Sequence, residues 1–339
     1  MKRRHLFTLA ACAVAVWATS SAQAVLLVYE PFDYNVGSQL TGQSGGQGFN
    51  AAWTGRENNL ANVPAGSTSI QAGSLAGPAG LVTQGGHALI TGASGTTQPA
   101  RTFSAQAQAA IAAQEGSGGS LWVSFLAQRQ GAANDTSTGA GSNWLNNPYP
   151  RGVNVSLFNA GLNDELTGIG NSSAASDNTW SIIPDGSGAQ REGAYNPAGG
   201  VAGGGPETVG AATYPWNDLH WAVVRIDYNG AGGNQDMRLW LDPDPTGAAP
   251  LDADAVATIL GTDTNYRTLL GVGGLRPFVG NQSGTVGGAN FQPAGVLVLD
   301  EIRVGTEFRD MNSTQVIPEP ATFGLLALAG AALAIRRRR

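Results

Sequence analysis

Cysteine is almost absent from this chain of 339 residues, and histidine is nearly as rare. The single cysteine, Cys12, lies near the N-terminus, so the rest of the chain can form no disulfide, supply no thiol nucleophile and bind no metal through sulfur. The three histidines are His5, His87 and His220. With so few imidazoles, we expect neither a histidine-rich metal site nor a Ser-His-Asp triad.

Basic charge is also scarce outside the two ends of the chain. Residues 25–315 contain 11 arginines, no lysine and 23 acidic residues, which gives a formal charge of about −12. Binding to nucleic acid requires a basic face, so we expect no nucleic-acid partner. An acidic surface favours solubility and the binding of cations.

The first 24 residues have the three parts of a secretory signal peptide. Basic residues at positions 2–4 precede an apolar run at 6–18, and Ala22 and Ala24 form an A-x-A cleavage site. We therefore expect export by the Sec machinery and cleavage after Ala24. Two alternatives stay open, because residues 9–12 are similar to a lipoprotein box and the arginine pair hints at the twin-arginine route.

The C-terminal segment, residues 316–339, contains Pro318, Glu319 and Pro320, then the uncharged run 321–335, and ends in four arginines. A helix over the uncharged run spans about 22 Å, which is short for a hydrocarbon core of about 30 Å. The sequence therefore predicts a short C-terminal transmembrane helix. Arginines beside a membrane span stay on the cytoplasmic side, so we expect the body of the protein to lie outside the inner membrane.

This order of parts, behind a signal peptide, resembles the PEP-CTERM sorting domain of exported proteins in Gram-negative bacteria. The resemblance implies that Pro318, Glu319 and Pro320 are a sorting motif read by exosortase, a membrane enzyme. It also implies a protein that is transiently anchored in the inner membrane and then reaches the cell surface or the extracellular matrix. A plain membrane anchor is the alternative interpretation of this tail.

Residues 25–315 form the predicted body domain, in which several segments alternate apolar and polar residues as half-buried strands do. The pattern of segment 295–305 predicts a long strand, with one face formed by Val296, Val298, Asp300, Ile302 and Val304. A carboxylate on an apolar face is costly, so Asp300 requires either a bulge in the strand or buried hydrogen-bond partners. Alternation also predicts strands at 120–128, 220–228 and 236–242, the last two joined by a hairpin loop at 229–235. Further strands are expected at 25–32, 87–92, 99–104, 152–158 and 178–184, and helices at 104–114 and 252–260.

Many antiparallel strands and few helices indicate a sandwich of two sheets. Segments 220–244 and 298–311 resemble the strand–turn–strand and the final strand of laminin-G-like and concanavalin-like jelly rolls. The resemblance implies an all-β, concanavalin-like jelly-roll β-sandwich of two antiparallel sheets, flanked here by the N-terminal signal helix and the C-terminal transmembrane helix.

Some concanavalin-like proteins are polysaccharide-active enzymes, which need two carboxylates on the same face of a strand. The spacing typical of such enzymes is Glu-x-Asp-x-x-Glu. Neither Glu30 with Asp33 nor Asp300 and Glu301 with Glu307 supply it, and Asp164 and Glu165 are adjacent and point to opposite faces. We therefore expect a protein that is not an enzyme. A polysaccharide-active hydrolase or lyase is the alternative.

Four aspartates in one acidic segment, Asp242, Asp244, Asp252 and Asp254, are candidate calcium ligands, because calcium prefers several oxygens from a flexible loop. A solvated acidic loop with Asp-Pro turns is the other interpretation. No other cofactor is expected.

Aromatic side chains in glycine-rich and proline-rich segments are candidate carbohydrate-binding residues, above all Trp144, Tyr149 and Trp216. Such rings also commonly cover the edge of a core. The sequence thus predicts an exported structural or adhesive protein that binds exopolysaccharide. A surface protein without a ligand is a further interpretation.

Overall fold

A computed structural model describes residues 26–92, 96–130, 153–171, 180–184, 218–229, 235–261, 269–280, 285–286, 289–290 and 296–314. Several residues named above lie outside these ranges. They are the cleavage site at Ala22 and Ala24, the aromatic candidates Trp144, Tyr149 and Trp216, and the sorting motif Pro318, Glu319 and Pro320 with the predicted transmembrane helix.

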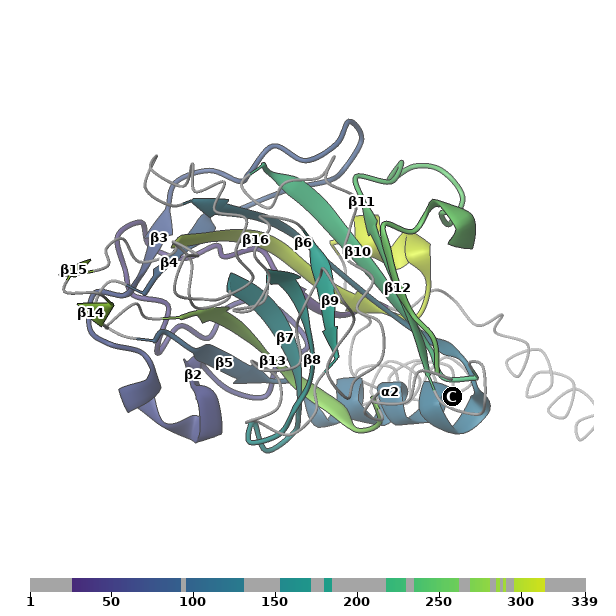
Figure 1. Ribbon diagram of the computed structural model, residues 1–339, viewed down its shortest axis with the longest axis horizontal. Helices are drawn as coiled ribbons and strands as arrows, with labels where there is room; N and C mark the ends of the chain where they lie inside the picture. Colours follow the sequence, from purple (N-terminus) through teal and green to yellow (C-terminus); the bar gives the residue numbers. More distant parts are fainter. Residues whose placement is uncertain are drawn as a thin grey trace, which may run out of the picture.

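Two antiparallel sheets form the body (Figure 1). The eight-stranded sheet has the order β12 (Ala257–Ile259), β11 (Asp236–Leu241), β10 (His220–Asp227), β6 (Ser120–Gln130), β16 (Val296–Gly305), β4 (His87–Thr91) and β3 (Thr68–Gln71), and β1 (Leu26–Glu30) also pairs with β16. The six-stranded sheet has the order β2 (Thr54–Gly55), β5 (Pro99–Thr102), β13 (Val272–Val279), β7 (Val153–Asn159), β8 (Glu165–Asn171) and β9 (Ser181–Pro184). A separate hairpin pairs β14 (Thr285–Val286) with β15 (Ala289–Asn290).

Helical structure is limited in the described ranges to α2 (Ala105–Ser117) and the short 3-10 helices η1 (Arg56–Asn58), η2 (Leu60–Asn62), η4 (Asp252–Asp254) and η5 (Phe308–Asn312). The prediction of an all-β sandwich with two antiparallel sheets is therefore confirmed. The strands expected at 25–32, 87–92, 99–104, 152–158 and 178–184 correspond to β1, β4, β5, β7 and β9, and the helix expected at 104–114 corresponds to α2.

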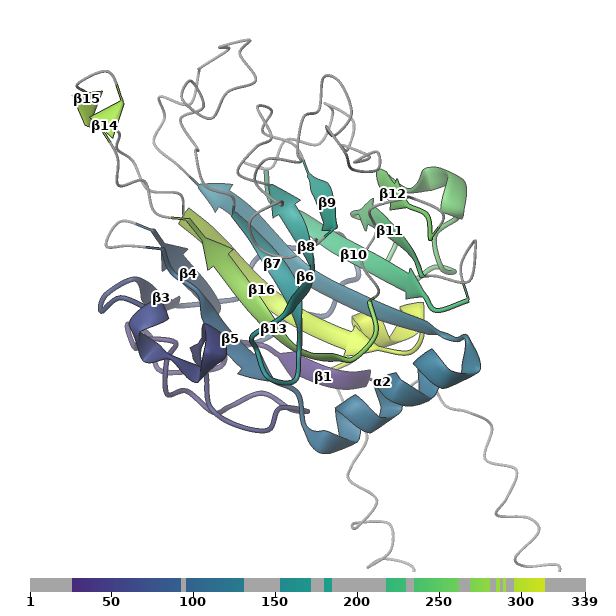
Figure 2. The same ribbon diagram turned by 60° about the horizontal axis from the view of Figure 1, so that its bottom comes forward.

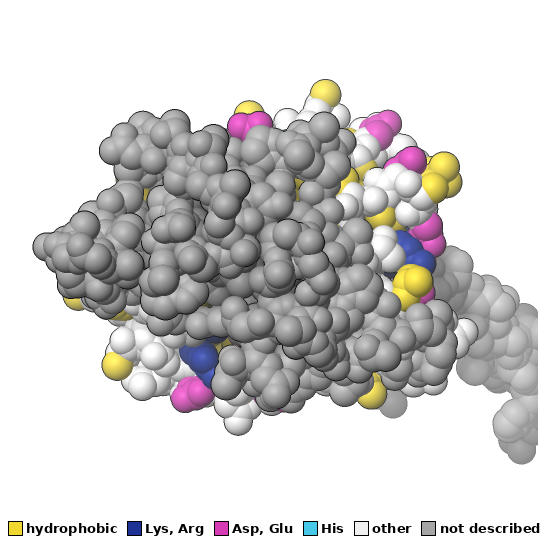
Figure 3. All heavy atoms as spheres, viewed as in Figure 1, with side chains coloured by type: hydrophobic (Ala, Val, Ile, Leu, Met, Phe, Trp, Pro, Cys, Tyr) yellow, Lys and Arg dark blue, Asp and Glu magenta, His cyan; other side chains and the backbone are white. Residues whose placement is uncertain are grey.

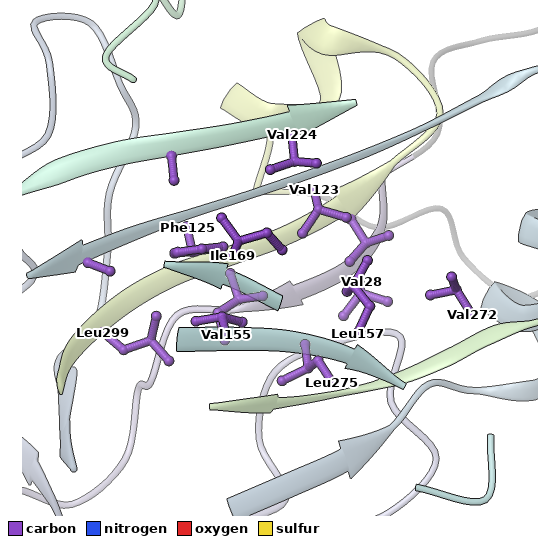
Figure 4. Close-up of a cluster of buried hydrophobic side chains, with 14 of the residues drawn as sticks. Val28, Val123, Phe125, Val155, Leu157, Ile169, Val224, Val272, Leu275 and Leu299 are labelled. Atoms are coloured by element: carbon purple, nitrogen blue, oxygen red, sulfur yellow. The ribbon is translucent and has the colours of Figure 1, made fainter. Parts of the chain in front are cut away.

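The core lies between the two sheets. Val123 and Phe125 of β6 meet Val155 and Leu157 of β7 in one buried cluster (Figure 4). The period of two predicted for β6, β10 and β11 is confirmed, since alternate residues of each strand belong to this core. The intervening tryptophans, Trp122, Trp221 and Trp240, lie on the outer face of the eight-stranded sheet in a second buried cluster.

The predicted faces of β16 are wrong in its first half. Leu297 and Leu299 face the core there, rather than Val296 and Val298. The reason is a β-bulge, because the register with β6 shifts after Asp300 and Glu301 has a left-handed φ of 55°. One extra residue reverses the alternation, so the core-facing residues resume at Ile302 and Val304.

The helix predicted at 252–260 is also wrong. Only Asp252–Asp254 forms a short 3-10 helix, and Ala257–Ile259 pairs with β11 as the edge strand β12. Strands β3, β8 and β13 were not predicted from the sequence. In β8 and β13, glycines and Pro277 interrupt the apolar pattern.

Two glycines with similar backbone conformation offer a test of packing near β1. Gly48 has φ +77°, and a Cβ atom there would overlap the carbonyl group of Leu27; Gly37 has φ +82° with open space around it. We expect Gly37→Ala to cost about 1–2 kcal/mol for the left-handed conformation. Gly48→Ala should cost about 1–3 kcal/mol more, since the backbone must also move apart. Urea unfolding of both variants measures the difference, and equal losses would contradict the packing described here.

Candidate functional site

Strand ends from both sheets gather at one end of the sandwich, which we call the loop-bearing end. In the eight-stranded sheet, Val296 at the start of β16 lies opposite Gln130, the last residue of β6, and Thr91, the last residue of β4. In the six-stranded sheet, Val153 at the start of β7 lies opposite Val279, the last residue of β13. Figure 2 shows the β14–β15 hairpin toward this end, and α2 and β1 toward the other.

Thr97 connects the two sheets at the loop-bearing end. It forms a bridge with Val279 of the six-stranded sheet, and its Oγ1 donates a hydrogen bond of 2.7 Å to the carbonyl oxygen of Thr91 in the eight-stranded sheet. The strand ends of both layers therefore belong to one rigid edge. Loops that carry binding residues are commonly positioned by such a scaffold.

The segments that contain the aromatic candidates are attached at this edge. Trp144 and Tyr149 belong to the segment between Gln130 and Val153, both of which lie at the loop-bearing end. Trp216 precedes β10, whose first residue, His220, lies opposite Ala127 near the end of β6. These three aromatic residues lie outside the described ranges, so their role stays a prediction.

A polar cluster lies on the outer face of the six-stranded sheet, where Arg276 of β13 lies opposite Ser156 in the middle of β7. Arg276 of β13 donates through Nη2 to Glu165 Oε2 at 2.8 Å and through Nη1 to Gln98 Oε1 at 2.8 Å. The Ser156 hydroxyl on β7 lies 2.6 Å from Glu165 Oε1 and 2.7 Å from Asn154 Oδ1. These contacts join β13, β7 and β8 side by side. We call this group the Arg276 cluster.

Aromatic rings and glycines complete this face. The rings of Phe158 and Phe278 lie 4.8 and 4.6 Å from the guanidinium carbon of Arg276, close enough for cation–π attraction. Gly168 and Gly170 of β8 lie opposite Ser156 and Asn154 of β7, so no β8 side chain lies beside these two residues. Arg276 is 2% exposed, so the cluster is buried and is not an open site.

Sequence reasoning missed the Arg276 cluster because the strand that carries it was not recognised. In "VGGLRPFV" the glycines and the proline hide the alternation. Leu275 and Val279 do keep a period of two, and both belong to the core. That spacing was the one signal that could have placed Arg276 on the opposite face.

Two of the candidate calcium ligands have protein partners. Asp242 accepts a hydrogen bond from the backbone N–H of Trp221 at 2.8 Å and lies 2.5 Å from His220 Nδ1. Asp252 pairs with Arg225 at 2.7 Å. Figure 3 shows acidic and basic side chains next to each other over this part of the surface.

The other two candidates are likewise exposed. Asp244 accepts from the backbone N–H and the hydroxyl of Thr246, and these bonds lower the pKa of its carboxyl group. Asp254 lies at the end of η4. Across the residues that the structure describes, no three acidic or histidine side chains come together around a common metal position. A calcium site formed by these four aspartates stays a prediction.

Asp300 and Glu301 are neighbouring carboxylates at the bulge of β16, and both are fully buried. Asp300 accepts from the backbone N–H groups of Leu75 and Glu301, each at 2.8 Å. Burial and the neighbouring charge of Glu301 raise the pKa of Asp300 to about 9. Both features foreseen from the sequence, a bulge and backbone N–H donors, are therefore present.

Glu301 completes this buried group through different partners. Tyr29 donates its hydroxyl to Glu301 Oε2 at 2.9 Å, and Arg303 donates to the same oxygen at 2.6 Å. The backbone N–H of Gln84 donates to Glu301 Oε1. The two carboxylates thus hold residues 75–84 against the outer face of the eight-stranded sheet through hydrogen bonds. Because Asp300 and Glu301 are buried there, a substrate cannot reach them.

Another buried ion pair lies at the end of β1. Glu30 Oε2 accepts from Arg101 at 2.8 Å, from the Tyr34 hydroxyl at 2.7 Å and from Trp53 Nε1 at 2.9 Å. Burial raises the pKa of Glu30, and the charge of Arg101 opposes that shift. The pair is not a candidate site, because no surface of Glu30 is exposed.

Comparison with known proteins identifies the tail. The family model described as "PEP-CTERM protein-sorting motif" matches residues 316–339. This confirms the resemblance seen in the sequence and marks the chain as an exported protein of the kind that exosortase sorts. No curated protein matches the chain.

Solved structures match this chain only at low similarity. The binding domain of botulinum neurotoxin serotype D/C VPI 5993 is 10% identical, with 67% of this chain and 42% of that chain covered and a TM-score of 0.33. The binding domain of botulinum neurotoxin DC in complex with rat synaptotagmin II is 10% identical, with 83% and 50% covered and a TM-score of 0.37. This chain therefore spans half or less of the toxin domains that it matches.

A mutant of the alginate lyase Aly36B, in complex with alginate tetrasaccharide, is 9% identical, with 79% of this chain and 95% of that chain covered and a TM-score of 0.32. Similarities this low carry no argument about function.

None of the helices in the described ranges of the structure is long and apolar enough to cross a membrane. The predicted transmembrane helix lies beyond those ranges.

Proposed function

We propose that this chain is an exosortase-sorted protein of the cell surface or extracellular matrix, and that its body is a structural or adhesive module that binds exopolysaccharide. The tail motif at 316–339 supports the sorting step. The binding step rests on the loop-bearing end. Both flanks of the segment with Trp144 and Tyr149 lie there, and the flank after Trp216 lies close by.

Two physical features favour binding at this end, and the charge of the body limits which ligands it can bind. Aromatic side chains supply large rigid contact surfaces that lose little entropy on binding. The edge that carries their segments is held by Thr97, which bridges to Val279 and donates a hydrogen bond to Thr91. The body is acidic and contains no lysine. Its ligands are therefore expected to be neutral or to bind through arginine.

The polysaccharide-active alternative needs an acid and a base that face one cleft. Within the described part of the Arg276 cluster, Glu165 is the single carboxylate, and it is already paired with Arg276. The adjacent pair Asp300 and Glu301 is fully buried and holds backbone N–H groups. The described geometry thus supports binding better than two-carboxylate hydrolysis.

Binding to exopolysaccharide purified from the native host tests the proposal. We expect the triple variant Trp144→Ala, Tyr149→Ala, Trp216→Ala to bind at least about 30-fold more weakly, because truncation of even one central aromatic residue of a binding site costs about 2 kcal/mol. The matched control is Leu60→Ala with Leu251→Ala, two exposed apolar residues outside these segments. Calcium and EDTA arms test the four aspartates.

Binding that stays unchanged in the triple variant would overturn the binding part of the proposal. Degradation of the polysaccharide would instead favour the enzymatic alternative. Mass spectrometry of the protein secreted by its host tests the sorting part, with an N-terminus at Val25 and a C-terminus near Pro318 as the expected result. Recovery of intact residues 316–339 in all of the secreted protein would contradict it.

A further inference from the structure

The end of the described chain is packed against one face of the sandwich. Phe308 and Met311 of η5 belong to the buried cluster on the outer face of the eight-stranded sheet. The ring of Phe308 lies 5.5 Å from that of Trp122 and 6.2 Å from that of Trp221. The chain therefore leaves β16 and returns across the face that is turned away from the six-stranded sheet.

Hydrogen bonds hold this path in place up to its last residues. Asn312 Oδ1 accepts from the backbone N–H of Val82 at 2.7 Å, and its Nδ2 donates to the carbonyl oxygen of Gly80 at 3.1 Å. The carbonyl oxygen of Ser313 accepts from Nε of the buried Arg303 at 2.9 Å. The point at which the tail departs is thus fixed at Ser313, over the C-terminal part of β16.

The connection from this point to the sorting motif is short. Four residues separate Ser313 from Pro318, so even a fully extended chain covers no more than about 18 Å. The ten residues of β16 alone extend over about 33 Å. The tether from Ser313 to Pro318 is therefore shorter than β16. A tether this short cannot let the body rotate freely above a membrane.

The loop-bearing end lies far from the departure point. Val296 marks that end, and Arg303 lies seven residues further along β16, which corresponds to about 23 Å. The six-stranded sheet with the Arg276 cluster is the opposite layer of the sandwich, so both sheets stand between that cluster and Ser313.

We propose that a chain anchored through residues 316–339 is held with the outer face of its eight-stranded sheet toward the lipid headgroups, and with its six-stranded sheet and loop-bearing end toward the exterior. This rests on the proposed function, since it assumes that the tail enters the membrane. The membrane-facing surface includes the exposed residues Val82, Leu251 and Arg309. The acidic loop at 242–254 lies beside them, so the tether rather than electrostatic attraction sets the orientation.

Cysteine labelling can test this orientation, because the single cysteine, Cys12, lies in the predicted signal peptide and residues 25–315 contain none. Leu251→Cys and Leu60→Cys form a matched pair, since the two leucines are 69% and 60% exposed. Leu251 accepts a hydrogen bond from Trp240 on the membrane-facing side, whereas Leu60 lies in η2 beside β2 of the six-stranded sheet. The full chain is produced in a bacterial host without exosortase, and spheroplasts are treated with a bulky, membrane-impermeant maleimide.

We expect labelling of the Leu251→Cys variant to be severalfold slower than labelling of the Leu60→Cys variant. A long Gly-Ser spacer inserted between Thr314 and Gln315 should remove the difference, because the body can then rotate. Equal rates without the spacer would overturn the orientation and leave the proposed function intact. The same would follow from a difference that persists with the spacer.

The remaining outcomes separate this inference from the function on which it rests. A full chain found only in the soluble fraction would overturn both membrane sorting and orientation. Asymmetric labelling together with failure to bind exopolysaccharide would support the orientation and overturn only the binding part of the proposed function.

Discussion

Replacement of Arg101 by methionine is expected to destabilise the folded body by about 3–5 kcal/mol, because it leaves Glu30 as a buried carboxylate without its cation. Arg101 also donates through Nε to the carbonyl oxygen of Ala51 and through Nη1 to that of Gly45. Its guanidinium carbon lies 4.0 Å from the centre of the Phe49 ring. The side chain thus joins β1, β5 and the connection between them.

The surface pair Arg309 and Glu307 provides the matched control for this variant. Their side chains are 64% and 46% exposed, and their separation is 2.8 Å, the same as in the buried pair. Arg309→Met should change the free energy of unfolding by no more than about 1 kcal/mol, because water screens an exposed pair. Urea unfolding at neutral pH measures both variants. A loss for Arg101→Met as small as that for Arg309→Met would show that Glu30 does not depend on this partner.

The stability of the body should fall as the pH rises from about 4 to about 9, and Asp300 should account for part of that fall. Its pKa is raised to about 9 in the folded state, so folding takes up a proton between the ordinary aspartate pKa of about 4 and that value. A single such group changes the free energy of unfolding by up to about 1.4 kcal/mol per pH unit. Burial also raises the pKa values of Glu30 and Glu301, which act in the same direction.

The variant Asp300→Asn tests how much of this loss of stability with rising pH is due to Asp300. The variant stays neutral at every pH, so its stability should decline less steeply between pH 5 and pH 8 than that of the unchanged protein. Asp244→Asn is the control, since the pKa of exposed Asp244 is lowered and its titration lies below this window. Urea midpoints at several pH values supply the slopes. If Asp300→Asn keeps the full slope, Asp300 is ionised in the folded protein throughout this range.

Much of the sandwich was predictable from local pattern. The period of two in β6, β10 and β11 placed their core faces correctly, and the strands at β1, β4, β5, β7 and β9 were found by the same signal. Where glycine or proline interrupts a strand, as in β8 and β13, that signal fails. In β16 one bulge was enough to reverse the faces of half a strand, although the carboxylate beside the bulge had signalled it.

The candidate site was only partly predictable for a related reason. The sequence could point to aromatic residues and to acidic residues by type, since type needs no partner. It could not show that Asp252 would pair with Arg225, or that Arg276 would meet Glu165 from a strand more than a hundred residues away. Such pairs are set by strand order and register, which no local window contains.

The sequence by itself determined the two ends of this protein and the chemistry of its middle. The sorting motif is read as a linear segment, and the lack of cysteine and lysine needs no fold to have its effect. Only the tertiary structure decided which strand ends share the loop-bearing end and on which face Ser313 is fastened. A linear signal depends on neighbours in the chain, whereas a binding face and an orientation depend on residues that pairing between strands brings together.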